Sequence, residues 1–234
     1  MLNIYGSNGA LIQVLAEGFL LIGRQVFTTT GPNTYTPTTG TRAVLVELIG
    51  GGAGGFNTVN STAGQLIAAG GGASGAYSAK FLSILQTDIF TAVVGAGGSN
   101  IGGNGNVSTF TDNSNSAILC SAPGGSAGTT VTTGTAETYG TNGGGTAGAS
   151  IGDIGFDNNK AQLAHRVSAT LGMSGRGGSG PHGGRPVSTI AHGNGAAGVK
   201  YGSGGNGGVS INAAGTTTGG VGGQGLAIVW EFAR

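Results

Sequence analysis

The hydrophobic positions of this chain fall mostly in short runs, several of which alternate with a period of two. Residues 42–49 read RAVLVELI and would be apolar on both faces, which predicts a buried β-strand. A turn is expected at Gly31-Pro32-Asn33, because glycine, proline and asparagine favour turn conformations. Further strands are expected at 26–30, 34–38, 76–84, 88–94, 108–111, 117–122 and 226–232. Strands near both ends predict one mainly β domain whose termini lie together.

A helical pattern occurs once. In KAQLAHRVSATL (160–171), Leu163, Val167 and Leu171 recur at four-residue steps after a capping-like Asp-Asn-Asn at 157–159. The sequence therefore predicts at most one short helix.

Glycine dominates the segments between the expected strands, with 54 glycines among 234 residues. They form blocks such as GGNGG (204–208) and GGVGGQG (219–225). Between Gly172 and Gly208, every glycine number leaves a remainder of zero or one on division by three. Three residues per turn is the repeat of the polyproline-II helix, which has no internal hydrogen bonds. The phase predicts packed polyglycine-II helices, in 172–208 above all.

Composition favours order over a flexible linker. Hydrophobic residues make up 38% of the chain and charged residues 7%, whereas disordered chains usually show low hydrophobicity and high charge. We therefore expect a β-sandwich-like glycine-rich domain with long loops. Function is expected in these loops, because a regular scaffold leaves them free to vary. The irregular segments are 56–69, 129–142, 149–171, 185–192 and 209–218.

The first 25 residues differ from the rest. An apolar stretch runs from Ala10 to Ile22, interrupted by Gln13 and Glu17, without the basic region of a signal peptide. It is too short and interrupted to span a bilayer, so no membrane insertion is expected. We divide the chain into an attachment or assembly segment, 1–25, and a glycine-rich domain, 26–234.

The charge content is low, with nine basic and eight acidic residues and a net charge of +1. No basic stripe is present, so no nucleic-acid partner is expected. So few charges give poor solubility for an isolated subunit, which favours a protein that lives in an assembly. The single cysteine, Cys120, lies in an apolar run and is expected to be a small buried side chain.

Motifs for catalysis and for cofactors are weak or absent. GGGAGG (50–55) satisfies G-x-G-x-x-G, but the following residues open a helix poorly and no acidic residue follows at ribose distance. The histidines His165, His182 and His192 have no cysteine or carboxylate at zinc-ligand spacing. No G-x-S-x-G nucleophile elbow occurs. We expect neither an enzyme nor a cofactor or metal site.

Three ordered segments resemble a known family. VFTTTGPNTYTPTTGTRAVLVELIGGGAGG (26–55) resembles the opening of glycine-rich domains in phage tail-fibre and tail-tip proteins. TAVVGAGGSNIGGNGNVSTF (91–110) and GGVGGQGLAIVWEF (219–232) are similar to later elements of the same domains. More loosely, the chain resembles the distal adhesins of T-even-type phages. Residues 1–25 match no attachment domain of that family.

The resemblance implies a virion protein at the tip of a tail or fibre. Its partners would be a host cell-surface receptor, either an outer-membrane protein or lipopolysaccharide, and other tail-fibre subunits. The chain would be a homotrimer or a cap on a trimeric fibre, and loops on the polyglycine-II scaffold would bind the receptor.

The candidate contact residues are aromatic, histidine and arginine side chains in or beside the irregular segments. They are Phe56, Tyr139, Phe156, His165, Arg166, Arg176, His182, Arg185, His192 and Tyr201. Amphipathic rings give large contact area at low entropic cost, and Arg166 and Arg185 suit phosphate or carboxylate groups. Two alternatives remain open: a purely structural tail component that caps or trimerises a fibre, and an ice-binding polyglycine-II protein.

Overall fold

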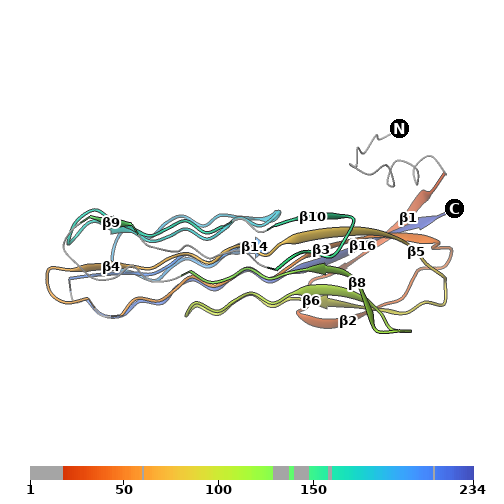
Figure 1. Ribbon diagram of the computed structural model, residues 1–234, viewed down its shortest axis with the longest axis horizontal. Helices are drawn as coiled ribbons and strands as arrows, with labels where there is room; N and C mark the ends of the chain where they lie inside the picture. The colour runs from red at the N-terminus through yellow and green to blue at the C-terminus, as the bar shows by residue number, and fades with distance from the viewer. Residues whose placement is uncertain (1–17, 60, 129–136, 140–147, 158–159, 213) are drawn as a thin grey trace.

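The protein is an elongated molecule built of strands and glycine-rich segments (Figure 1). The computed structural model describes residues 18–59, 61–128, 137–139, 148–157, 160–212 and 214–234. Within these ranges every regular element is a strand, which confirms the mainly β class. A β-sandwich forms one end, and a bundle of extended glycine segments runs from it to the opposite, distal end.

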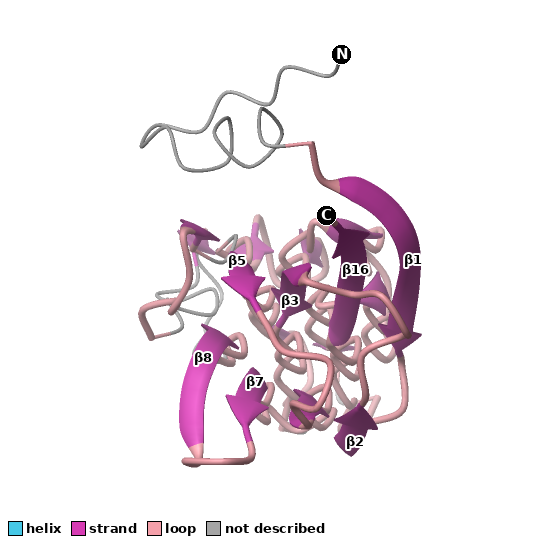
Figure 2. Ribbon diagram, turned by 90° about the vertical axis from the view of Figure 1, so that its right-hand side faces the viewer, coloured by secondary structure: helices cyan, strands magenta, loops and turns pink. Residues whose placement is uncertain are grey.

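The sandwich has two antiparallel sheets. One has the strand order β1-β16-β3-β5-β10, with bounds Leu20–Phe27 (β1), Leu226–Ala233 (β16), Ala43–Ile49 (β3), Tyr77–Ser83 (β5) and Ile154–Phe156 (β10). The other has the order β2-β6-β7-β8, with bounds Gly31–Tyr35 (β2), Phe90–Val94 (β6), Ser108–Asp112 (β7) and Ala117–Ala122 (β8). Seen from this end, the two sheets lie one above the other (Figure 2).

The core of the sandwich follows from alternation along β3. Val44, Val46 and Leu48 point between the sheets and are fully buried, together with Phe110 and Val229. Cys120 joins this core, where burial raises the pKa of its thiol, so the expectation of a small buried side chain is confirmed.

Both ends of the described chain belong to one sheet. β1 pairs antiparallel with β16 from Leu20 to Phe27, with a bulge between Leu21 and Gly23. The two ends of the described chain, at β1 and β16, therefore lie together, as expected. Because β1 begins at Leu20, residues 20–25 are part of the sandwich.

Residues 50–56 show how the glycine bundle is held together. Successive N–H groups donate to three different neighbouring segments in rotation, with N···O distances of 2.8 to 3.0 Å. In order, the donor and acceptor residues are Gly50 and Ala76, Gly51 and Asn106, Gly52 and Gly223, Ala53 and Ala73, Gly54 and Gly103, Gly55 and Gly220, and Phe56 and Gly70. Each neighbour is met again after three residues, which is the repeat of polyglycine II.

The same segment is surrounded on all sides. Its carbonyls accept hydrogen bonds from Gly98, Gly125 and Gly205, which lie on three further segments. With the three acceptor segments, this makes six neighbours around 50–56. In the end-on view the glycine segments appear as an array of coils behind the sheets (Figure 2).

The most enclosed segments are 50–55, 66–76 and 202–210, where every residue is buried. The polyglycine-II arrangement predicted for 172–208 is therefore present, but only its last part is central. Residues 193–198 lie at the edge of the bundle.

Small sheets decorate the bundle. At the distal end, β4 (Leu66–Ala68) pairs with β15 (Val209–Ile211), and a second sheet has the order β12-β11-β9. The bounds of these three are Gly172–Met173 (β12), His165–Arg166 (β11) and Thr138–Tyr139 (β9). Closer to the sandwich, β13 (His182–Gly184) pairs with β14 (Val199–Tyr201).

Local predictions were wrong in two parts of the chain, 160–171 and 26–38, where the strands expected at 26–30 and 34–38 share only two residues each with β1 and β2. Residues 160–171 form no helix: Val167 N–H donates to the carbonyl of Leu171, which closes a hairpin between β11 and β12. Residues four apart are neighbours across such a short loop as well as on a helix, so the spacing fitted both. Gly31, Pro32 and Asn33 lie inside β2 and pair with β6, and the chain bends at Thr29 and Thr30 instead.

Candidate functional site: the distal face

The distal hairpin has one buried side and one outward side. Ala164 and Arg166 point inward, and Ala164 packs with Leu66, Ala68 and Val209 in a small core. Period-two alternation then turns the intervening residues away from the bundle. We call these outward residues the distal face: Leu163, His165, Val167, Leu171 and Met173.

The distal face is mainly apolar. Leu163, Val167, Leu171 and Met173 are each 43 to 57% exposed. His165 lies opposite Met173 in the β11–β12 pair. Single exposed apolar residues are normal on a protein, whereas these four lie on or beside one small sheet.

Two side chains of β11 contact residues on or next to β9, the neighbouring strand of the same sheet. His165 Nε2 lies 3.2 Å from Glu137 Oε1, and Arg166 Nη2 donates to Thr138 Oγ1 at 2.8 Å. Arg166 is only 2% exposed, so its guanidinium serves the interior of the distal end. Tyr139 pairs with His165 through the backbone.

The other candidate residues do not join the distal face. His182 and Arg185 are exposed on or beside the β13–β14 hairpin, and Tyr201 lies opposite His182 in that pair. His192 is exposed next to Gly193, which bridges Val209 of β15. Arg176 is half-buried and its Nε donates to the carbonyl of Pro186 at 3.1 Å.

The remaining two belong to the scaffold and to the sandwich. The ring of Phe56 lies against Gly102, where an added Cβ would meet its Cδ2. Phe156 is 62% exposed at the edge strand β10, with its ring 5.7 Å from that of Tyr77. The ten candidates are thus spread over four regions of the molecule: the distal end, the β13–β14 side of the bundle, the bundle itself and the sandwich.

Sequence reasoning missed the apolar members of the distal face. The four-residue spacing of Leu163, Val167 and Leu171 predicts a helix, and Met173 lies outside that pattern. The signal that could have found them is the alternation of Leu163, His165 and Val167 before a short Ser-Ala-Thr turn.

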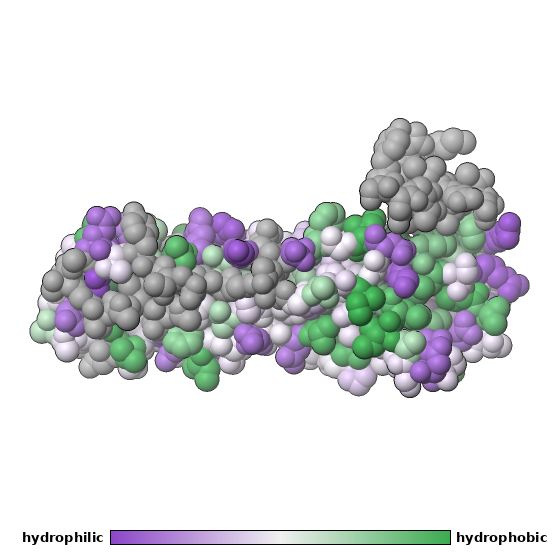
Figure 3. Space-filling view, in the orientation of Figure 1, coloured by the Kyte–Doolittle hydropathy of each residue, from purple (hydrophilic) through white to green (hydrophobic). Residues whose placement is uncertain are grey.

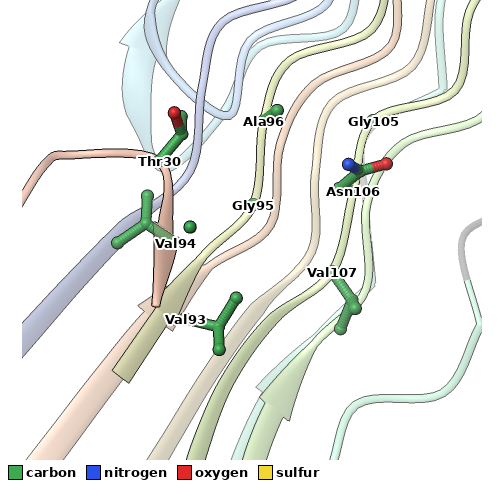
Figure 4. A pocket seen from close by; sticks show the side chains of 9 residues that line it. Thr30, Val93, Val94, Gly95, Ala96, Gly105, Asn106 and Val107 are labelled. Atoms are coloured by element: carbon green, nitrogen blue, oxygen red, sulfur yellow. The ribbon is translucent and has the colours of Figure 1, made fainter. Parts of the chain in front are cut away.

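A shallow groove lies where the glycine bundle leaves the second sheet (Figure 4). It has a volume of about 590 Å³ and is lined by Thr30, Gly31, residues 93–96 and residues 105–107. Valine, alanine and glycine dominate its wall, and none of these residues titrates. The groove therefore carries no side chain suited to acid–base chemistry.

Metal-binding and membrane-spanning features were also sought. The described ranges hold no cluster of three or more histidine, cysteine, aspartate or glutamate side chains placed to bind a metal ion. None of the described residues forms a helix that is long and apolar enough to cross a membrane.

Comparison with known families agrees with the architecture. A family model described as a glycine-rich domain matches residues 28–230. The chain belongs to this family. In this glycine-rich domain the match begins just after β1 and finishes within β16, so it covers the bundle, the distal end and the sandwich apart from β1 and the last residues of β16. A search of curated proteins found no match.

Proposed function

We propose that this glycine-rich domain is a phage tail-fibre or tail-tip protein that binds a host cell-surface receptor through its distal end. The observation that carries the proposal is the arrangement of the two ends. The strands at the chain ends, β1 and β16, lie in the sandwich, and the distal face lies across the length of the glycine bundle from them (Figure 1). Such a molecule can be held at one end and present the other.

The bundle supports this division of labour through its hydrogen bonds. Its segments are joined backbone to backbone, so few side chains are needed to maintain it. The residues between the glycine segments can then change with little effect on the scaffold. This is the usual relation between a rigid framework and variable binding loops.

The chemistry of the distal face suits contact with a protein receptor. Its exposed apolar side chains would gain free energy from burial against an outer-membrane protein, with His165 as a polar member. The exposed Arg185, on the side of the bundle, suits the phosphate or carboxylate groups of lipopolysaccharide. The two surfaces therefore make separate predictions about the receptor.

Binding of the labelled protein to a panel of bacterial cells tests the proposal. The double variant Leu171→Ser and Met173→Ser removes two apolar contacts from the distal face. We expect binding to weaken about tenfold or more, because burying each such side chain contributes roughly 1.5–3 kcal/mol. Leu85→Ser is the matched control, since Leu85 is 63% exposed near the sandwich. It should bind as the unaltered chain does.

Two outcomes would contradict the proposal. If the distal double variant and the Leu85 variant bound cells equally well, the distal face would not be the contact. If no cell type bound the unaltered chain while the chain co-assembled with fibre subunits, a purely structural role in the tail would replace receptor binding.

A further inference from the structure

The outer face of the five-stranded sheet, which points away from the sandwich core, is apolar, and several of its side chains are exposed. Apart from four buried residues, Ala43, Ile49, Ala79 and Leu226, its side chains are half-buried or exposed, whereas the opposite face is sealed in the core. We call this the outer face. Its large side chains are Leu21, Val26, Leu45, Phe81, Phe156, Ile228, Trp230 and Phe232. Figure 3 views the sandwich from the side, with the outer face at its upper edge, and shows hydrophobic residues over this half of the molecule.

The polar groups of the outer face are already engaged with one another. Glu47 accepts hydrogen bonds from Tyr77 Oη and Trp230 Nε1, both at 2.6 Å. The Arg24 guanidinium carbon lies 5.4 Å from the centre of the Trp230 ring. A hollow of about 370 Å³ lies beside them, lined by residues 21–24 and Trp230. The face thus offers an apolar surface with one depression.

The size of the outer face favours a short segment over a second copy of the chain. Five strands at about 4.8 Å spacing and seven residues at about 3.3 Å give a surface of roughly 500 Å². A stable protein–protein interface takes about 800 Å² from each partner. An extended segment of eight to ten residues needs less.

The chain just before β1 already lies on this face. The ring of Phe19 packs edge-on against Phe81 at 5.8 Å, although Phe81 lies on β5, three strands away from β1 in the sheet. Gly18, with φ of +81°, turns the chain there. Residues 1–17 lie outside the described residues, and their connection to the domain starts over the outer face.

The sequence of that segment matches the surface. Residues 10–16 read ALIQVLA, and Glu17 is the one charged side chain among residues 1–17. Seventeen residues reach about 56 Å when extended, more than twice the width of the sheet. Arg24, at the rim of the hollow, is the complementary charge.

We propose that residues 10–17 of the chain dock onto the outer face and cover the hollow beside Trp230. Leu11, Val14 and Leu15 supply the apolar contacts. A short tether gives an effective concentration of the order of mM, so an affinity of only about 0.1 mM would keep the segment docked. The docked segment shields the apolar sheet within a single chain.

Trp230 is the only tryptophan of the chain, so its fluorescence reports directly on this surface. We would measure acrylamide quenching in the full-length chain, in the double variant Leu11→Asp and Leu15→Asp, and in the control Asn3→Asp and Asn8→Asp. Both variants add two negative charges, but only the first places them in the apolar run. The first should raise the quenching constant about twofold or more, since an uncovered ring is reached freely. The control should leave it unchanged.

The dependence on protein concentration completes the experiment. Docking within one chain gives the same quenching at every concentration. Protection that grows with concentration would mean that a second copy covers the face, which overturns the proposal. Equal quenching in all three proteins would overturn it too, because the segment would then not touch Trp230. Circular dichroism checks that the variants keep the fold.

Discussion

At the scale of single residues, the glycines of the bundle are required because the neighbouring backbone occupies the space that a side chain would need. A Cβ added at Gly52 would lie 2.1 Å from the carbonyl oxygen of Ser203, and one at Gly55 would lie 1.8 Å from that of Asn206. Neither glycine has a positive φ. The backbone conformation is therefore open to alanine, and close packing of the neighbouring segment excludes it.

Gly52→Ala tests this explanation. We expect a loss of about 3 kcal/mol or more in the free energy of unfolding, because the neighbouring backbone cannot move aside as a flexible side chain would. Gly184→Ala is the matched control, since its Cβ would meet only Val199 side-chain atoms at 3.6 and 3.7 Å. Chemical denaturation measures both. Similar stabilities for the two variants would contradict the backbone-packing account.

A second residue-scale feature is the buried carboxylate of Glu231 in the sandwich. It accepts hydrogen bonds from Gln25 Nε2, Tyr35 Oη, and both the backbone N–H and the hydroxyl of Thr38. Tyr35 is fully buried. Burial, and then the hydrogen bond and charge of Glu231, raise the pKa of the Tyr35 hydroxyl well above its ordinary value of 10.0.

This raised pKa predicts alkaline destabilisation. Below pH 10 Tyr35 is protonated in both states, and above it only the unfolded chain releases the proton. Stability should therefore fall by about 1.4 kcal/mol per pH unit above pH 10 on account of Tyr35 alone. Tyr35→Phe should lower stability at neutral pH and make the alkaline decline shallower by that amount. Equal slopes in denaturation series from pH 9 to 11 would refute the assignment.

At the scale of elements, the sequence predicted what depends on local alternation. The strands at 42–49, 76–84, 88–94, 108–111, 117–122 and 226–232 were found within one or two residues of their observed bounds. Their side chains alternate in the sequence because one face packs in the sandwich core. The period of three in the glycine blocks could also be recognised in the sequence, because each of the three faces of a segment meets a different neighbour.

The distal end was less predictable because its contacts join distant parts of the chain. The four-residue spacing of Leu163, Val167 and Leu171 is compatible both with a helix and with a short hairpin. The hairpin forms because β11 packs beside β4 and β9, which are remote from it in sequence. Arg166 and Arg185 looked equivalent as candidate contact residues, and only the fold separates them.

These two arginines give a prediction at this scale. Arg166 is buried and bonded to Thr138, so Arg166→Ala should destabilise the distal end by about 1–3 kcal/mol. Arg185 is exposed, and Arg185→Ala should change stability by less than about 0.5 kcal/mol. Residue-resolved hydrogen exchange over 163–173 measures the difference. Equal exchange in both variants would show that Arg166 does not hold the distal hairpin.

At the scale of the whole molecule, the protein is divided into an end that holds β1 and β16 and an end that carries the distal face. The sandwich has a conventional hydrophobic core, the bundle is held by its backbone, and the distal core is small. The three parts therefore tolerate change to different degrees. Sequence change at the distal face is the least costly for the fold and the most consequential for the proposed binding.

Oxidative footprinting of the chain bound to host cells tests this two-ended account most directly. Met173 lies on the distal face and Trp230 on the sandwich, and each is the only described residue of its type, so each reports on one end. The account predicts that cell binding protects Met173 from hydroxyl radicals and leaves the oxidation of Trp230 unchanged. Protection of Trp230 with Met173 still reactive would contradict it, because the molecule would then face the cell with its sandwich.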